Sequence, residues 1–494
     1  MIGKKDRWHQ DLFCVGPLDK LVPKDHILRR IREKIDLSWV VNEVRDSYCS
    51  YDGRPSIDPE SALCLLIAGY FYGIIHHREL LRVANENIAI RWFIGYRLDE
   101  TLPTHSALGK ILDRWGEERF KRIFKRVVKA CIEAGLVDGK LIHIDATLIR
   151  ADVSWESMVE EHTDRVLKEN ADAPESTDNS PAAPDAPAGK RRRGRPRTRP
   201  VKPAKKRSTT DPDATLATSS HNRKLEPCFK EHAAVDDKSG VIVDVAVETG
   251  EASEGEQLLA QIDRVESNTG QTVEVVTADA GYAHPHNYAQ LEQRKIDAVI
   301  PPQREARRAA KLPLRRFKYD RQHQIVRCPG GKKLRRSYEA RDHKGWVYRA
   351  AVSDCRDCPL RSRCITAKTQ SRTVLIVNDY EALLRARRRK ARGWDEETRK
   401  RYNRHRWRVE GKHAEGKERH GLRRAVRRGR AKVAIQAYLT AIVINLKVMV
   451  GSWGPPGQAV FGAICRWRLV IWVLLPTIER SIRSKQPHPV KMAA

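Results

Sequence analysis

The sequence predicts a multidomain α/β protein, and three observations point to that class. The chain has 494 residues, which suggests two to four domains rather than one. Hydrophobic residues make up 40% of the chain, enough for a sizeable core. The patterning also changes along the chain. Residues 1–135 favour helices, residues 136–300 contain short apolar strands alternating with helices, and residues 386–452 favour helices again.

Residues 1–135 are predicted to form one helical domain. The segment DHILRRIREKI (25–35) spaces its isoleucine and leucine residues along one face of a helix, with Asp25 as the expected N-cap. The segment SIDPESALCLLIAGYFYGI begins with capping residues and continues into an apolar helix. No alternation typical of strands interrupts this region.

Residues 136–164 and 215–300 are predicted to form the first part of a mixed-sheet core. GKLIHIDATLIRADV is rich in β-forming residues, and PCFKEHAAVDD and VIVDVAVETG form a predicted hairpin around Lys238-Ser239-Gly240. A helix ending at Gly270, the strand TVEVVTA, a short helix and the strand DAVIPP follow. This order is typical of a mixed sheet with helices on its faces.

Two segments interrupt the predicted core. Residues 165–214 join a proline-rich stretch to the basic stretch KRRRGRPRTRPVKPAKKR, so we expect a disordered basic linker. Residues 301–385 are predicted to be a β-rich, cysteine-containing insertion, with pieces such as GWVYRAAV and RTVLIV. Residues 386–452 would return to the core as helices, and residues 453–494 would form a C-terminal tail.

The charge of the chain predicts a polyanionic partner. The net charge is +31, and such an excess concerns partners rather than fold. The apolar runs AIVINLKVMV and LVIWVLLPTI are too short for a membrane span of about 20 residues, so we interpret both as core helices. The first residues show no secretory signal. We therefore expect a cytoplasmic, nucleoid-associated protein that binds nucleic acid and no membrane.

Two aspartates are candidates for metal-dependent phosphodiester chemistry, which needs carboxylates that converge on divalent ions. Asp145 lies among apolar neighbours in LIHIDATLIR, where an unpaired carboxylate is costly to bury. Asp279 follows VEVVTA, and ligands collect at the carboxyl ends of strands in open α/β sheets. The structural alternative for each is a residue at a strand end or turn that faces solvent.

Glu410 lies in a segment with helical periodicity. Five polar or amphipathic side chains would share one face of that helix: Tyr402, Arg406, Glu410, His413 and Lys417. One interpretation is a catalytic carboxylate flanked by groups that bind phosphates. The other is a solvated surface face.

Together these motifs resemble the DDE transposases of bacterial insertion sequences. In that family the first Asp lies on the first core strand, as in HIDATLIRAD, and the second follows the fourth strand, as in TADAGYA. The Glu lies on a later helix with a Tyr-Arg-Glu-Lys signature, which here reads Tyr402, Arg406, Glu410 and Lys417. Three residues rather than two separate the Tyr from the Arg. GRPSIDPESALCLLIAGYFYGI and LPTHSAL resemble parts of the family's helical domain, and FKEHAAVDDKSGVIVDV resembles its second and third core strands.

The resemblance implies an RNase H-like catalytic core in an enzyme that cleaves the ends of its element and transfers them into target DNA. Asp145, Asp279 and Glu410 would hold two Mg²⁺ or Mn²⁺ ions. Tyr402, Arg406 and Lys417 would contact DNA. The implied partners are double-stranded DNA, as terminal inverted repeats and as target, and a second copy of the chain in a synaptic homodimer. The helical domain would bind DNA ends or dimerise. Two alternatives stay open: a catalytically inactive, transposase-derived DNA-binding regulator, and a simple RNase H-like nuclease.

Two further motifs lie outside the acidic triad. Cys328, Cys355, Cys358 and Cys364 have the spacing C-x26-C-x2-C-x5-C, which suits a structural zinc site. Four reduced thiols are the alternative. Arg193, Arg195 and Arg197 in RGRPR resemble the core of an AT-hook, which lies in the minor groove of A·T tracts. The alternative is a basic linker that binds any DNA by counterion release.

Overall fold

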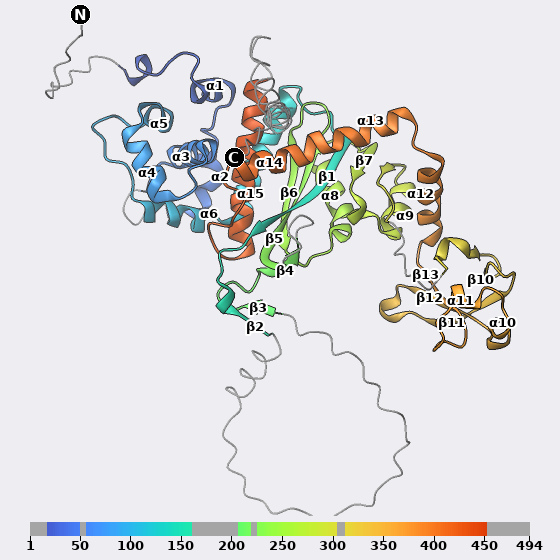
Figure 1. Cartoon of the computed structure of the whole chain (residues 1–494). Coiled ribbons are helices and arrows are strands. Elements are labelled where there is room, and N and C mark those ends of the chain that lie inside the picture. Colours follow the sequence, from blue (N-terminus) through green and yellow to red (C-terminus); the bar gives the residue numbers. More distant parts are fainter. Residues whose placement is uncertain (1–16, 50–55, 161–205, 219–224, 304–311, 452–494) are drawn as a thin grey trace, which may run out of the picture.

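The computed structural model describes residues 17–49, 56–160, 206–218, 225–303 and 312–451. Within these ranges, a helical N-terminal part packs beside a central mixed sheet. A second, smaller sheet lies beyond the opposite side of the central sheet, and helix α12 connects it to the rest of the chain (Figure 1). The multidomain α/β class predicted from the sequence is confirmed at this level.

The described residues up to 135 form helices, as predicted. These are α1 (Ile27–Lys34), α2 (Val40–Val44), α3 (Pro59–Tyr72), α4 (His77–Glu86), α5 (Ile88–Ile94) and α6 (His105–Glu133). The predicted cap of α1 is wrong by one residue. His26 rather than Asp25 is the N-cap, because its Nδ1 accepts a hydrogen bond from the N–H of Leu28 at 3.3 Å.

The central sheet is mixed and contains the predicted hairpin. Its strands are β1 (Leu141–Arg150), β4 (Thr215–Thr218), β5 (Leu225–Asp236), β6 (Ile242–Thr249), β7 (Val275–Ala278) and β8 (Asp297–Val299). The order is β4-β5-β1-β7-β8, with β6 also paired to β5. Strands β1, β7 and β8 run parallel, whereas β5 is antiparallel to β1, β4 and β6. Helices α8 (Glu254–Thr269) and α9 (Pro285–Gln293) connect the strands where the sequence predicted helices.

Helix α15 (Arg430–Gly451) joins the helical part to the sheet. It packs against α6 and β6, and the amide of Asn445 exchanges two hydrogen bonds of 2.8 Å with the backbone of Ile242 in β6. Among the described residues, α15 is the one helix long and apolar enough to cross a membrane, but 89% of its apolar window is buried inside the protein. It is therefore the core helix that the sequence predicted.

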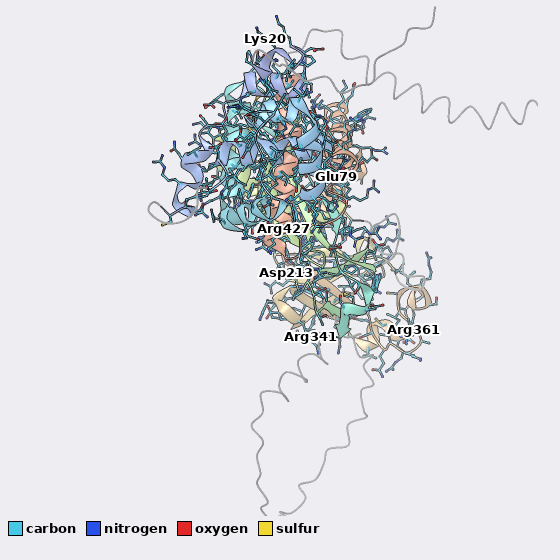
Figure 2. All side chains as sticks on the ribbon, turned by 90° about the vertical axis from the view of Figure 1, so that its left-hand side faces the viewer. Lys20, Glu79, Asp213, Arg341, Arg361 and Arg427 are labelled. Atoms are coloured by element: carbon cyan, nitrogen blue, oxygen red, sulfur yellow. The ribbon has the colours of Figure 1, made fainter. Side chains whose placement is uncertain are left out.

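The predicted insertion contains a separate five-stranded antiparallel sheet. Its strands are β9 (Lys318–Asp320), β10 (Ile325–Arg327), β11 (Lys333–Glu339), β12 (Gly345–Ala350) and β13 (Thr373–Val377). The short helices α10 (Val352–Arg356) and α11 (Arg361–Cys364) lie between β12 and β13, and α12 (Tyr380–Arg392) follows. Figure 2 labels Arg341 and Arg361, which lie in the segments between these strands, far from Lys20 of the helical part.

Part of the predicted linker is ordered. The structure describes it only from residue 206 onward, where β3 (Lys206–Ser208) pairs with β2 (Met158–Glu160). The hydroxyls of Ser157 and Ser208 hydrogen-bond to each other at 2.9 Å and stabilise this ribbon. Disorder was therefore the wrong prediction for these last residues of the linker.

Candidate active site

Asp145 and Asp279 lie side by side on neighbouring parallel strands. In the register of β1 and β7, Ile144 pairs with Ala278, so the next residue of each strand is one of the two aspartates. Asp279 directly follows β7 and caps the turn after it, where its Oδ1 accepts a hydrogen bond of 2.7 Å from Gly281 N. The structure thus brings together two of the three predicted carboxylates.

The surroundings of these two aspartates disfavour their negative charge. Burial raises the pKa of Asp145 to about 6; Asp279 and Glu254 add to the shift, and His413 opposes it. Burial also raises the pKa of Asp279, with further contributions from Glu254 and Glu410. A bound cation would stabilise the charged form of carboxyl groups whose pKa is raised in this way.

Glu410 lies near the aspartate pair but does not form a three-carboxylate cluster with it. It ends the π-helical turn η7 (Arg406–Glu410), which joins α13 (Glu396–His405) to α14 (Gly411–Arg419). Its side chain is 54% exposed and forms an ion pair of 3.5 Å with Arg406. Among the described residues, no three His, Cys, Asp or Glu side chains are already grouped to hold a metal ion.

The π-helical turn η7 changes the spacing of side chains along this helix. A π turn contains more residues than an α turn, so the positions from Glu410 onward are rotated relative to those before Arg406, including Tyr402. Partial burial raises the pKa of Tyr402, and Asp279, Glu410 and Asp145 add to the shift, which places its hydroxyl near the acidic site. The prediction of one regular helical face is wrong, since the π turn interrupts the helix and the side chain of Arg406 is 82% exposed whereas that of His413 is 8% exposed.

Two basic side chains of α14, His413 and Lys417, also lie near Asp145. His413 is only 8% exposed, with Nδ1 3.5 Å from Glu231 and Nε2 4.0 Å from Asp145. Burial lowers the pKa of Lys417, and Glu231 and Asp145 partly oppose this shift, which places its ammonium group near both acids. Glu231 was missed in the sequence, although alternation along β5 puts it beside Thr147, on the same face as Asp145.

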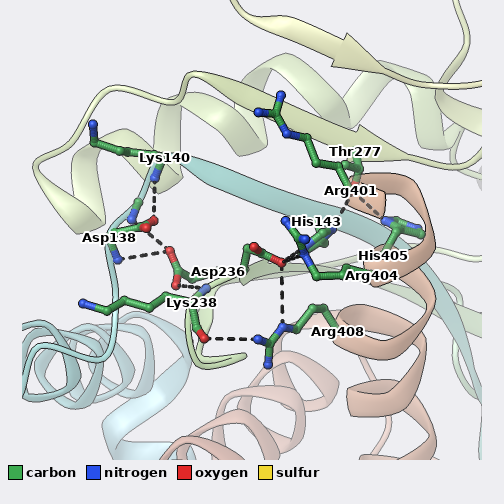
Figure 3. A network of polar contacts seen from close by, with 12 residues as sticks. Asp138, Lys140, His143, Asp236, Lys238, Thr277, Arg401, Arg404, His405 and Arg408 are labelled. Carbon is green, nitrogen blue, oxygen red and sulfur yellow. Dashed lines mark hydrogen bonds and ion pairs between the residues drawn. The ribbon is translucent and has the colours of Figure 1, made fainter. Parts of the chain in front are cut away.

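A buried polar network fixes the helix that carries Glu410 onto the sheet (Figure 3). The hydroxyl of Thr277 hydrogen-bonds to His143 at 2.7 Å and to His405 at 2.8 Å. Asp237 accepts a hydrogen bond of 2.8 Å from Arg404 and contacts His143 at 2.9 Å. His143 and Thr277 each precede a candidate aspartate by two residues, so they share its strand face. That alternation could have identified them in the sequence.

The four clustered cysteines are brought near one another. A Cβ at Gly330 would lie 3.6 Å from the sulfurs of both Cys328 and Cys358. Burial raises the pKa of Cys364, and the other three thiols add to this shift. None of the four forms a disulfide bond. The thiols therefore lie close together, but they are not grouped in a geometry that could hold a metal ion. Arg193, Arg195 and Arg197 lie outside the described residues.

Comparison with known proteins identifies transposase domains at both ends of the described chain. The family model "Transposase domain (DUF772)" matches residues 16–114, and the model "Transposase DDE domain" matches residues 327–450. A search of curated proteins finds no match. The cryo-EM structure of a piggyBac transposase synaptic complex with hairpin DNA aligns over 95% of this chain and 86% of that chain, with 10% identity and a TM-score of 0.29. That similarity is too low to support an argument. The two matches support an insertion-sequence DDE transposase, with one transposase domain near the start of the described chain and a DDE domain near its end.

Proposed function

We propose that this protein cleaves DNA at the ends of an insertion sequence and joins those ends to target DNA by two-metal-ion chemistry. The observation that carries the proposal is the position of Asp145 beside Asp279, below the helix that carries Glu410. The strand order β6-β5-β1-β7-β8, with β5 antiparallel in an otherwise parallel centre, supports an RNase H-like core.

The donor set suits Mg²⁺ or Mn²⁺. Asp145, Asp279 and Glu410 offer only carboxylate oxygens, which these hard cations prefer. The raised pKa values of the two aspartates give a cation a favourable place to bind. Divalent ions there would activate the attacking oxygen and stabilise the leaving one. Glu410 would have to exchange its ion pair with Arg406 for a position facing the aspartates.

The cations around the acids would position the DNA. Arg406 is exposed beside Glu410, and Lys417 lies near Asp145. Both could hold phosphates next to the reacting one, and Tyr402 could pack against the sugar-phosphate backbone. The net charge of +31 favours DNA along much of the surface. We further propose that two copies act together on paired element ends, in the cytoplasm and on the nucleoid.

We also propose that Cys328, Cys355, Cys358 and Cys364 hold a structural zinc ion in the small sheet. Two arginines already brace the segment, because Arg361 donates to the carbonyl of Cys355 at 2.8 Å and Arg372 donates to that of Cys364 at 2.9 Å. Protein purified without chelator should contain one equivalent of zinc by elemental analysis. Replacing Cys355 and Cys358 with Ser should abolish that content, whereas Cys49→Ser should preserve it. Zinc absent from the wild type would contradict the site.

The type of product tests the main proposal. Purified protein, incubated with its element ends, a target plasmid and Mg²⁺ or Mn²⁺, should yield both cleaved ends and ends joined to the plasmid. Cleaved ends without joined products would instead indicate a nuclease. Tight DNA binding without any product, in either metal, would indicate an inactive, DNA-binding regulator.

A further inference from the structure

A fourth carboxylate, Glu254, lies within the electrostatic reach of the candidate active site. It is the first residue of α8, and its Oε1 forms an ion pair of 3.2 Å with Lys230. The side chain is 30% exposed. Glu254 adds to the negative field at three groups of the site, Asp145, Asp279 and the buried Tyr282.

The backbone makes room for Glu254 beside Asp279. A Cβ added at Gly281 would lie 2.2 Å from Glu254 Oε2 and 2.9 Å from Asp279 Oδ1. The two carboxylate oxygens therefore flank one small space, which only a glycine leaves free. The carboxylates of Glu254 and Asp279 carry like charges and repel each other across this space. Lys230 pairs with Oε1 of Glu254, so its ion pair offsets the repulsion at only one of the two oxygens.

A second observation marks the same site as incomplete. The Nε2 atom of His413 is buried and has no hydrogen-bond partner. It points towards Asp145 but remains 4.0 Å from its Oδ2. Buried polar atoms are normally paired. A carboxylate cluster beside a buried histidine whose Nε2 atom has no hydrogen-bond partner is the arrangement expected where a ligand completes the contacts.

We propose that Glu254 is a further catalytic-site carboxylate, which acts with Asp145 and Asp279 to bind a divalent cation. The inference rests on the proposed function, because it assumes that the two aspartates bind such an ion. The competing role is structural: Glu254 would serve only to pair with Lys230 and to favour the first turn of α8. In that role, its charge would matter for stability and not for the metal.

The test is direct measurement of Mn²⁺ binding to the full chain without DNA, by calorimetry or by electron paramagnetic resonance. Glu254→Gln keeps the shape of the side chain and removes its charge. We expect it to weaken Mn²⁺ binding by about tenfold, the low end of what loss of a supporting metal contact costs. Glu254→Asp should recover part of the affinity. Lys230→Met breaks the same ion pair without removing a carboxylate, so it should leave Mn²⁺ affinity unchanged or slightly improved.

The outcomes separate this inference from the proposed function, provided that each variant shows a cooperative thermal unfolding transition. If Asp145→Asn weakens Mn²⁺ binding but Glu254→Gln binds like the wild type, Glu254 has no role at the metal site and only this inference fails. If Lys230→Met weakens binding as much as Glu254→Gln does, the role is structural and the inference also fails. If Asp145→Asn itself leaves binding unchanged, the proposed metal site fails and the inference fails with it.

Discussion

The Asp145→Asn variant is expected to lose DNA cleavage and strand transfer while it gains thermal stability. The amide keeps the size of the side chain but removes the charge that a divalent ion needs. DNA binding should be nearly unchanged, because phosphate contacts come from cations such as Lys417 and Arg406. An Asp145→Asn protein that still cleaves element ends would contradict the assignment of this residue.

The gain in stability follows from the raised pKa of Asp145. Its pKa is about 6 in the folded protein, against 3.8 for an ordinary Asp. The folded state therefore binds this proton more tightly than the unfolded state does, and the charged carboxylate destabilises the fold above pH 6. A shift of about two pKa units corresponds to at most about 3 kcal/mol. The penalty fades as the pH falls from 6 towards 4.

Thermal unfolding of the metal-free protein, measured in the presence of a chelator, tests this predicted gain in stability. At pH 7.5, Asp145→Asn should unfold at a higher temperature than the wild type, whereas near pH 4 the two should unfold together. Glu274→Gln is a suitable control, because this exposed acid precedes β7 and pairs with Lys140 at the protein surface. A difference between Asp145→Asn and wild type that does not change with pH would count against the burial argument.

The Thr277→Val variant should be strongly destabilised, although it preserves the shape of the side chain. The Thr277 hydroxyl is the shared partner of His143 and His405, and all three residues are buried. Burial lowers the pKa of His405 to about 3, so the ring stays neutral and depends on this hydrogen bond. Leaving His143 and His405 without this hydrogen-bond partner should lower the free energy of unfolding by about 2–4 kcal/mol.

The same substitution should reduce cleavage, because the network holds the helix of Glu410 and Tyr402 on the sheet. A small displacement of catalytic groups can cost about a hundredfold in rate, so we expect a loss of about tenfold to a hundredfold. Chemical denaturation and single-turnover cleavage measure the two effects. Thr277→Ser keeps the hydroxyl and should stay close to the wild type in both. Equal losses in Thr277→Ser and Thr277→Val would show that packing, and not the hydrogen bonds, matters here.

The order of elements in the core could be predicted from the sequence, because each is marked by local features. The hairpin follows from apolar alternation around Lys238-Ser239-Gly240, and α8 ends at Gly270, which has a positive φ of 67°. Asp145 and Asp279 could be selected because Asp145 is an acid within an apolar strand and Asp279 is an acid that directly follows one. Their adjacency, however, depends on the parallel register of β1 and β7.

The parts that could not be predicted depend on long-range contacts or on small changes in backbone geometry. Glu254 looks like any acid in the first turn of a helix, and only its approach to Asp279 past Gly281 distinguishes it. The π-helical turn before Glu410 breaks the regular spacing from which a single helical face was predicted. Alternation places His143 and Thr277 on the same strand faces as the aspartates, but their contact with each other and with His405 joins separate parts of the chain.

The most direct test of the central claim is metal-dependent cleavage and strand transfer by Asp279→Ala, measured beside Glu274→Ala. Both variants remove an acid at an end of β7, but only Asp279 lies beside Asp145. We predict that the wild type and Glu274→Ala form joined products in Mg²⁺ or Mn²⁺ and that Asp279→Ala forms none while still binding element ends. Joined products from Asp279→Ala at the wild-type rate would contradict a catalytic centre built on Asp145, Asp279 and Glu410.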